Sequence, residues 1–155
     1  MRIKYLLIPL ILLLATNSLA IAGERFGIGV IAGNPDGITG KYLMNNNRAI
    51  DVGFGWKTSG DKEYQIYGDY LFYKYDLIKV PHGKLPLYFG VGARYINYRE
   101  DDGKDNKFGI RIPVGIEYLF WESRLGAFAE FVPVLSLTPD TKFEFGSGIG
   151  IRYFF

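Results

Sequence analysis

The sequence has 155 residues, with 18 basic and 16 acidic side chains, one histidine and no cysteine. This length is that of one ordinary domain. The absence of cysteine excludes a disulfide scaffold and a thiolate site. The small charge imbalance offers no basic stripe for nucleic acid and no charged tail, so we expect no nucleic-acid partner.

The first 22 residues have the pattern of a cleaved signal peptide. Arg2 and Lys4 precede an apolar run over 6–15, and the small-residue site Ala20-Ile21-Ala22 follows. The run is shorter than the roughly 20 residues that a membrane-spanning helix needs, which disfavours an uncleaved anchor. Cleavage after Ala22 would remove two of the 18 basic residues and none of the 16 acidic ones, leaving a neutral domain over 23–155 with 16 of each.

From residue 25 onward, apolar side chains alternate with small or polar ones at a period of two, which is typical of β-strands. Turn sequences such as Asn34-Pro35-Asp36-Gly37 and Thr138-Pro139-Asp140 separate these segments. Eight strands are predicted, over 25–32, 38–44, 49–56, 64–73, 87–97, 108–118, 125–137 and 143–155. Pro113 and Pro133 fall inside two of them and each removes a backbone donor, so we expect a β-bulge and a missing hydrogen bond at each proline.

The last predicted strand, 143–155, has two contrasting faces, which set the interpretation of the others. Phe143, Phe145, Ile149 and Ile151 lie on an apolar face, whereas the opposite face carries Glu144, glycines, Arg152 and Phe154. The polar faces of the other strands are also rich in glycine rather than in the Thr, Lys, Glu and Ser of a solvated sheet. Glycine at these positions indicates a crowded interior, as in a narrow barrel. The glycines are Gly27, Gly29, Gly53, Gly55, Gly90, Gly92, Gly109, Gly115, Gly146, Gly148 and Gly150.

These patterns predict an all-β fold, a closed antiparallel eight-stranded up-and-down transmembrane β-barrel. Aromatic residues near the ends of the apolar faces fit girdles at the two membrane surfaces. An even strand number would place both termini in the periplasm and the loops near 33–37, 57–63, 99–107 and 137–142 outside. The alternative is a soluble periplasmic lipocalin-like barrel that binds an apolar ligand, which requires the apolar faces to point inward.

The architecture resembles the transmembrane domain of OmpA and OmpX, small eight-stranded outer-membrane proteins. The ending Gly150-Ile-Arg-Tyr153-Phe-Phe155 is similar to their closing-strand assembly signal, although Ile149 stands where a polar residue is expected. This similarity implies assembly by the barrel-assembly machinery through Gly150, Tyr153 and Phe155.

The chain also resembles a group of short exported bacterial proteins that are predicted to be barrels. The motifs are Gly27-x-Gly29, Gly33-x-Pro35-x-Gly37, Lys41, Ala49-Ile-Asp51, Asp69-Tyr-Leu71, Arg111-x-Pro113-x-Gly115, Glu130-x-x-Pro133, Thr138-Pro139-Asp140 and Gly148-x-Gly150-x-Arg152-Tyr153. This resemblance implies a fold and an outer-membrane location and no activity.

Alternation places four basic and four acidic residues inside the predicted barrel: Lys41, Asp51, Asp69, Arg94, Arg111, Glu117, Glu130 and Arg152. Buried charges persist only when they are paired and hydrogen-bonded, so we expect these groups to contact one another. A structural salt-bridge network is the favoured interpretation. A narrow conducting path is the alternative, although eight strands leave little room for one.

No enzyme chemistry is predicted, although some eight-stranded barrels act on lipid A. Such chemistry needs a nucleophile beside a base, and the single histidine, His82, falls in a connection on the periplasmic side, away from the outer lipid leaflet. One histidine offers no metal cluster, and the Gly-x-Gly pairs lie within strands rather than before a helix, so no metal or cofactor is predicted. We expect a monomeric outer-membrane protein whose partner is the surrounding lipid, with a structural, envelope or surface-contact role.

Overall fold

A computed structural model describes residues 25–57, 62–98, 105–120 and 124–155. The predicted signal peptide lies outside these residues, as do most of the turn expected at 121–124 and parts of the loops at 57–63 and 99–107. Among the residues that the structure describes, no helix is long and apolar enough to cross a membrane.

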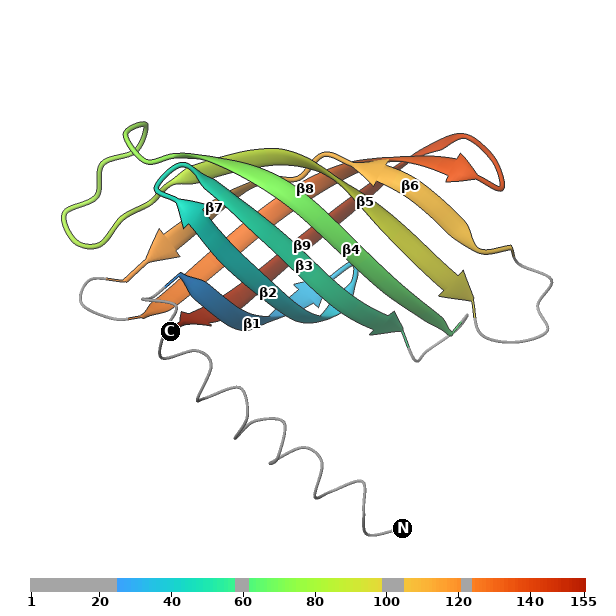
Figure 1. Ribbon diagram of the computed structural model, residues 1–155, viewed down its shortest axis with the longest axis horizontal. Helices are drawn as coiled ribbons and strands as arrows, with labels where there is room; N and C mark the ends of the chain where they lie inside the picture. The colour runs from blue at the N-terminus through green and yellow to red at the C-terminus, as the bar shows by residue number, and fades with distance from the viewer. Residues whose placement is uncertain (1–24, 58–61, 99–104, 121–123) are drawn as a thin grey trace, which may run out of the picture.

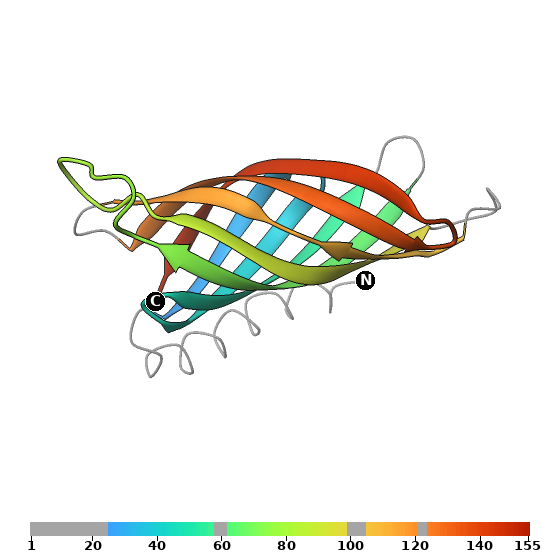
Figure 2. The same ribbon diagram turned by 90° about the horizontal axis from the view of Figure 1, so that it is seen from above.

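The described residues form one antiparallel sheet that closes on itself (Figures 1 and 2). Strands β1 to β5 each pair with the next in sequence, β6 and β7 both pair with β5 and with β8, β8 pairs with β9, and β1 pairs with β9 to complete the ring. Counting β6 and β7 as one interrupted strand, the ring has eight strands, which confirms the predicted fold. The strands are β1 Phe26–Gly33, β2 Asp36–Asn45, β3 Arg48–Lys57, β4 Glu63–Lys74, β5 Leu87–Tyr98, β6 Lys107–Arg111, β7 Val114–Leu119, β8 Leu125–Thr138 and β9 Lys142–Phe154.

The seam between the first and last strands is fully paired. Gly27 lies opposite Phe154 and Gly33 lies opposite Gly148, so the ladder runs along the whole of β1. Beyond the last paired residue, the Phe155 amide donates to the Phe26 carbonyl at 2.8 Å. The closing strand therefore leaves no free edge along β1, which is how a barrel satisfies its backbone groups.

The two mid-strand prolines do not produce the predicted bulges. From Arg111 to Val114 the pairing register does not shift against either neighbouring strand, β5 or β8. The register between β8 and β9 is also unbroken through Pro133, which lies opposite Phe145. The sixth strand is instead interrupted after Arg111, and the proline carbonyls still accept: Gly90 N donates to Pro113 O and Ile112 N donates to Pro133 O, both at 2.9 Å. Because proline has no N–H, each site loses only the reciprocal bond, as the sequence indicated.

The sheet is apolar on its outer surface and polar inside. Val52, Ile66 and Ile151 are 50%, 57% and 54% exposed, whereas Lys41 and Arg152 are 0% and 1% exposed. Aromatic rings also pack against one another on the outer surface, with centroids 6.0 Å apart for Phe54 and Trp56. This arrangement is the reverse of a lipocalin-like barrel, so the alternative of a soluble barrel with an apolar interior is wrong.

The barrel has two unlike ends. The C-terminus, the β2–β3 turn and the connection over 75–86 lie at one end, and the β1–β2 and β8–β9 turns lie at the other (Figure 1). We call these the terminal end and the far end. The charged lumen lies between them.

Candidate functional site in the barrel lumen

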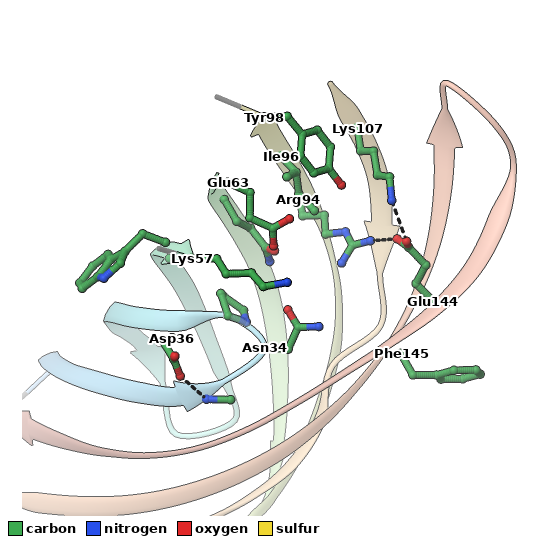
Figure 3. A pocket seen from close by; sticks show the side chains of 15 residues that line it. Asn34, Asp36, Lys57, Glu63, Arg94, Ile96, Tyr98, Lys107, Glu144 and Phe145 are labelled. Atoms are coloured by element: carbon green, nitrogen blue, oxygen red, sulfur yellow. Dashed lines mark hydrogen bonds and ion pairs between the residues drawn. The ribbon is translucent and has the colours of Figure 1, made fainter. Parts of the chain in front are cut away.

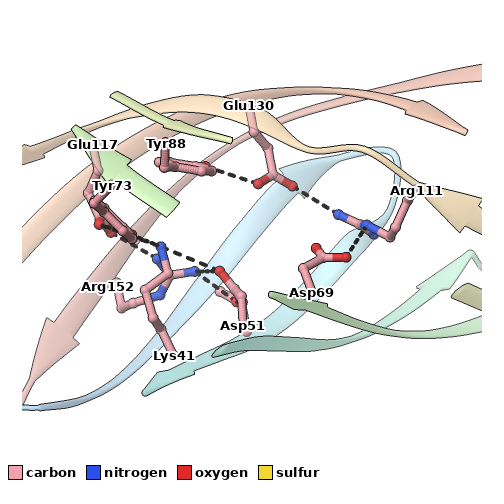
Figure 4. A network of polar contacts seen from close by, with 10 residues as sticks. Lys41, Asp51, Asp69, Tyr73, Tyr88, Arg111, Glu117, Glu130 and Arg152 are labelled. Atoms are coloured by element: carbon pink, nitrogen blue, oxygen red, sulfur yellow. Dashed lines mark hydrogen bonds and ion pairs between the residues drawn. The ribbon is translucent and has the colours of Figure 1, made fainter. Parts of the chain in front are cut away.

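Four buried charges from four strands meet in the middle of the lumen (Figure 4). Lys41 on β2, Asp51 on β3, Glu117 on β7 and Arg152 on β9 point inward because each occupies the inner phase of its strand's alternation. Arg152 lies 3.0 Å from Asp51 and 2.8 Å from Glu117, and Lys41 Nζ lies 3.4 Å and 3.5 Å from the same two carboxylates. This central quartet has two positive and two negative charges, so it is neutral as a unit.

Two hydroxyl groups add hydrogen bonds to the carboxylates of the central quartet. The Tyr73 hydroxyl accepts from Lys41 Nζ and donates to Glu117 Oε2 at 2.8 Å. The Thr39 hydroxyl donates to Asp51 Oδ1 at 2.7 Å and accepts from Arg152 at 2.8 Å. Each carboxylate therefore has a neutral donor as well as two cations, which offsets the cost of removing it from water.

A second cluster, the Arg111 triad, lies beside the quartet (Figure 4). Arg111 Nε is 2.9 Å from Asp69 Oδ1, and its Nη2 is 3.4 Å from Glu130 Oε1. The guanidinium carbon also lies 3.7 Å from the centre of the Tyr67 ring, a cation–π contact. The Tyr88 hydroxyl donates to Glu130 at 3.0 Å, so the triad is fixed from both sides.

Glycines opposite aromatic residues make room for these rings. Gly53 pairs with Tyr67 and Gly115 pairs with Tyr88 across neighbouring strands. A Cβ at Gly53 would lie 2.2 Å from the Tyr67 ring, and one at Gly115 would lie 2.3 Å from the Tyr88 ring. The same relation joins Gly150 to Phe128, whose ring lies 4.3 Å from the Arg152 guanidinium carbon. The missing side chains let the aromatic rings lie flat across the barrel wall and cover the ions.

The eighth predicted lumen charge, Arg94, belongs to a different cluster near the far end. Its guanidinium contacts Glu144 and donates to the Ser136 hydroxyl at 3.2 Å. Lys107 Nζ lies 3.0 Å from the same carboxylate, and Ser136 donates to it at 2.6 Å. We call these four residues the mouth cluster.

The structure thus brings seven of the predicted residues into two adjacent clusters and places Arg94 apart from them. Sequence reasoning assigned Glu144 to the inner face of the last strand but did not name it as a partner, and the alternation alone could have identified it. Tyr73 and Tyr88 were missed as hydrogen-bond donors because inward-facing aromatic residues weaken the alternation of β4 and β5. Thr39, Ser136 and Lys107 were also missed.

The two clusters separate a cavity at each end of the lumen. The far-end cavity has a volume of about 600 Å³ and is lined partly by Arg94, Lys107 and Glu144. The terminal-end cavity has a volume of about 660 Å³ and is lined partly by Asn46, Tyr75 and Lys84. The buried side chains of the quartet and the triad lie between them.

His82 lies at the terminal end, in the connection between β4 and β5, where its carbonyl accepts from the Tyr118 hydroxyl at 2.9 Å. Within the described part of the chain, no cluster of three or more His, Asp or Glu side chains could hold a metal ion.

An apolar exterior, a paired seam and a charged, side-chain-filled lumen define a small closed β-barrel of the type that spans outer membranes. The crystal structure of the N-terminal β-barrel domain of Pseudomonas aeruginosa OprF has the same fold, with a TM-score of 0.62 and 18% sequence identity over 84% of this chain and 96% of that one. At this identity the similarity shows the fold alone, and it confirms the predicted small-barrel architecture of the OmpA and OmpX type. No protein-family model and no curated protein matches the sequence.

Proposed function

We propose that the chain is an integral outer-membrane protein with a structural or surface-contact role in the cell envelope. The observation that carries the proposal is the polarity of the barrel. Apolar side chains such as Val30, Val52 and Ile66 are at least half exposed. The charged side chains of Lys41, Glu117 and Arg152 are at most 1% exposed. A soluble protein with this surface would present a continuous apolar belt to water, and a lipid bilayer removes that cost.

The lumen supports a structural role rather than a transport role. The central quartet and the Arg111 triad join strands that are far apart in sequence, such as β2 with β7 and β3 with β9, by ion pairs across the interior. Such cross-lumen pairs oppose flattening of the barrel and fill its middle. In this proposal the lumen is closed and the protein catalyses no reaction.

Insertion would depend on the last strand. Phe143, Phe145, Ile149, Ile151 and Tyr153 form its exposed face, and Gly150 lies on the inner face. We propose that Gly150, Tyr153 and Phe155 form the signal read by the barrel-assembly machinery, and that the signal peptide over 1–22 is removed on export. The folded protein would be a monomer with the terminal end in the periplasm and the far end at the cell surface.

Fractionation of Gram-negative cells that express the chain tests this proposal. We expect the protein in the outer-membrane fraction, extracted only by detergent, with a faster gel migration before heating than after it. Release of the protein with the soluble periplasmic contents would refute the membrane assignment.

A narrow channel is a second candidate function, because a cavity lies at each end of the barrel. Planar-bilayer recording separates the two. The proposed closed lumen gives no unitary conductance, whereas steps that change in Glu117→Gln would establish a path through the quartet.

A further inference from the structure

The far-end cavity is large and is lined mainly by polar side chains from several strands (Figure 3). Its volume of about 600 Å³ lies within the range of small-molecule sites, roughly 300–1,000 Å³. Asn34, in the β1–β2 turn, forms part of the wall and is held in place because its backbone N–H donates to the Ser147 carbonyl at 2.9 Å. Pro35 in the same turn packs over Gly55, where a Cβ would lie 2.3 Å from the proline ring.

Two buried polar groups that line this cavity have atoms without a partner in the described chain. Gln65 is 3% exposed and its Oε1 accepts no hydrogen bond, and Arg94 is 7% exposed and its Nε donates none. Buried polar atoms are nearly always paired, and leaving one unpaired is costly. The cavity thus offers an acceptor at Gln65 and a donor at Arg94 to whatever occupies it.

The charges around the cavity favour an uncharged occupant. Three basic residues, Lys57, Arg94 and Lys107, are balanced by three acidic ones, Asp36, Glu63 and Glu144. Arg94 and Lys107 are already paired with Glu144, and Asp36 accepts from the Gly33 amide at 2.8 Å. A charged ligand that paired with Arg94, Lys107 or Glu144 would have to displace these internal contacts, whereas a hydroxyl group can both donate to Gln65 and accept from Arg94 without breaking them.

We infer that the far-end cavity binds an uncharged, hydroxyl-rich molecule of mono- or disaccharide size, with Gln65 Oε1 as acceptor and Arg94 Nε–H as donor. This goes beyond the envelope role. In the proposed orientation the cavity faces the outside of the cell, but binding to the folded barrel does not depend on that orientation. A failure to bind sugar and a failure of the membrane assignment are therefore separate results.

Nuclear magnetic resonance can observe both atoms directly. Gln65 is the only glutamine in the sequence, so its side-chain amide is assigned by selective ¹⁵N-glutamine labelling. The full mature barrel would be folded in an amine-oxide detergent, which carries no sugar, and titrated with glucose and with trehalose. We expect saturable shifts of the Gln65 side-chain amide and the Arg94 Nε–H, with a millimolar or tighter dissociation constant for at least one sugar.

Two variants and a matched control test the assignment. Gln65→Leu removes the acceptor, and Arg94→Lys keeps a cation beside Glu144 but removes the Nε–H; each should weaken binding about tenfold or more, as expected for a lost buried hydrogen bond. Asn46→Leu makes the same kind of change at the terminal-end cavity and should leave the dissociation constant unchanged. Heat-modifiable gel migration verifies that each variant is folded.

Several outcomes would overturn the inference. One is the absence of saturable shifts with both sugars while the wild-type barrel is folded, which would leave the cavity as a site for water only. Another is binding that survives in Gln65→Leu and Arg94→Lys, which would place the sugar elsewhere. Saturation by gluconate or glucosamine, but by neither neutral sugar, would refute the uncharged chemistry.

Discussion

Replacing Arg152 with methionine should destabilise the folded barrel far more than the same change at an exposed arginine. Arg152 is 1% exposed and is 3.0 Å from Asp51 and 2.8 Å from Glu117. Without it, the central quartet contains two carboxylates and only Lys41, so one buried negative charge is uncompensated. Removing one partner of a buried ion pair costs about 3–5 kcal/mol.

That cost can be measured as a shift in urea unfolding. With about 4 kcal/mol lost and a slope of roughly 2 kcal/mol/M, the midpoint for Arg152→Met should fall by about 2 M. Unfolding from lipid vesicles can be followed by tryptophan fluorescence, since Trp56 is on the outer surface. Arg48→Met, the same change at an exposed position, should alter stability by less than about 0.5 kcal/mol.

A double variant tests whether charge balance is the reason. Adding Glu117→Gln to Arg152→Met leaves Lys41 and Asp51 as a neutral pair 3.4 Å apart, and glutamine can still accept from Tyr73. The double variant should therefore be at least as stable as Arg152→Met alone. If the costs of the two single changes simply add, the quartet does not act as a coupled network and the reasoning is wrong.

Three further predictions concern the packing of the barrel wall, its lipid-facing surface and its assembly. Gly53→Ala should lower the free energy of unfolding by about 1–3 kcal/mol, because its Cβ would lie 2.2 Å from the Tyr67 ring. Gly68→Ala, whose Cβ would have no atom nearer than 4.0 Å, should be near neutral, and equal urea midpoints for the two variants would contradict this. Val52→Arg, in the middle of β3, should destabilise the barrel in vesicles by about 2–4 kcal/mol. Met44→Arg, near the end of β2, should cost only about 0–1 kcal/mol, and equal costs for the two variants would argue against a lipid-facing belt. Phe155→Ala should lower the heat-modifiable fraction in outer membranes while refolding into detergent is retained, and unchanged assembly in cells would remove Phe155 from the proposed signal.

The strands could be predicted from sequence because period-two alternation is strong wherever one face is apolar and the other is glycine or charge. Inward charges such as Lys41 and Arg152 followed from the same alternation. Their partners could not be derived, since the pairing depends on which strands face each other across the lumen: Lys41 and Glu117 are 76 residues apart in sequence.

The inward aromatic residues show a second limit. Tyr73 and Tyr88 look like positions that weaken the pattern, but in the folded barrel they donate to buried carboxylates, and Tyr88 fits because Gly115 lies opposite it. The prediction of bulges at Pro113 and Pro133 was wrong, again because the outcome depends on the neighbouring strands. The ladder tolerates one lost donor at each site without a change of register, and only the paired neighbours reveal this.

Contacts between lipid and isoleucine methyl groups would show which face of the barrel wall meets the bilayer. Isoleucines on the outer surface, such as Ile38, Ile66 and Ile151, are more than half exposed, whereas Ile31 and Ile96 are inside and at most 5% exposed. In lipid nanodiscs, with only isoleucine δ1 methyls labelled, a barrel with an apolar exterior should give nuclear Overhauser effects from lipid acyl chains to the outer group and none to Ile31 or Ile96. Acyl-chain contacts to the inner pair, or water contacts in place of lipid along the outer group, would contradict it.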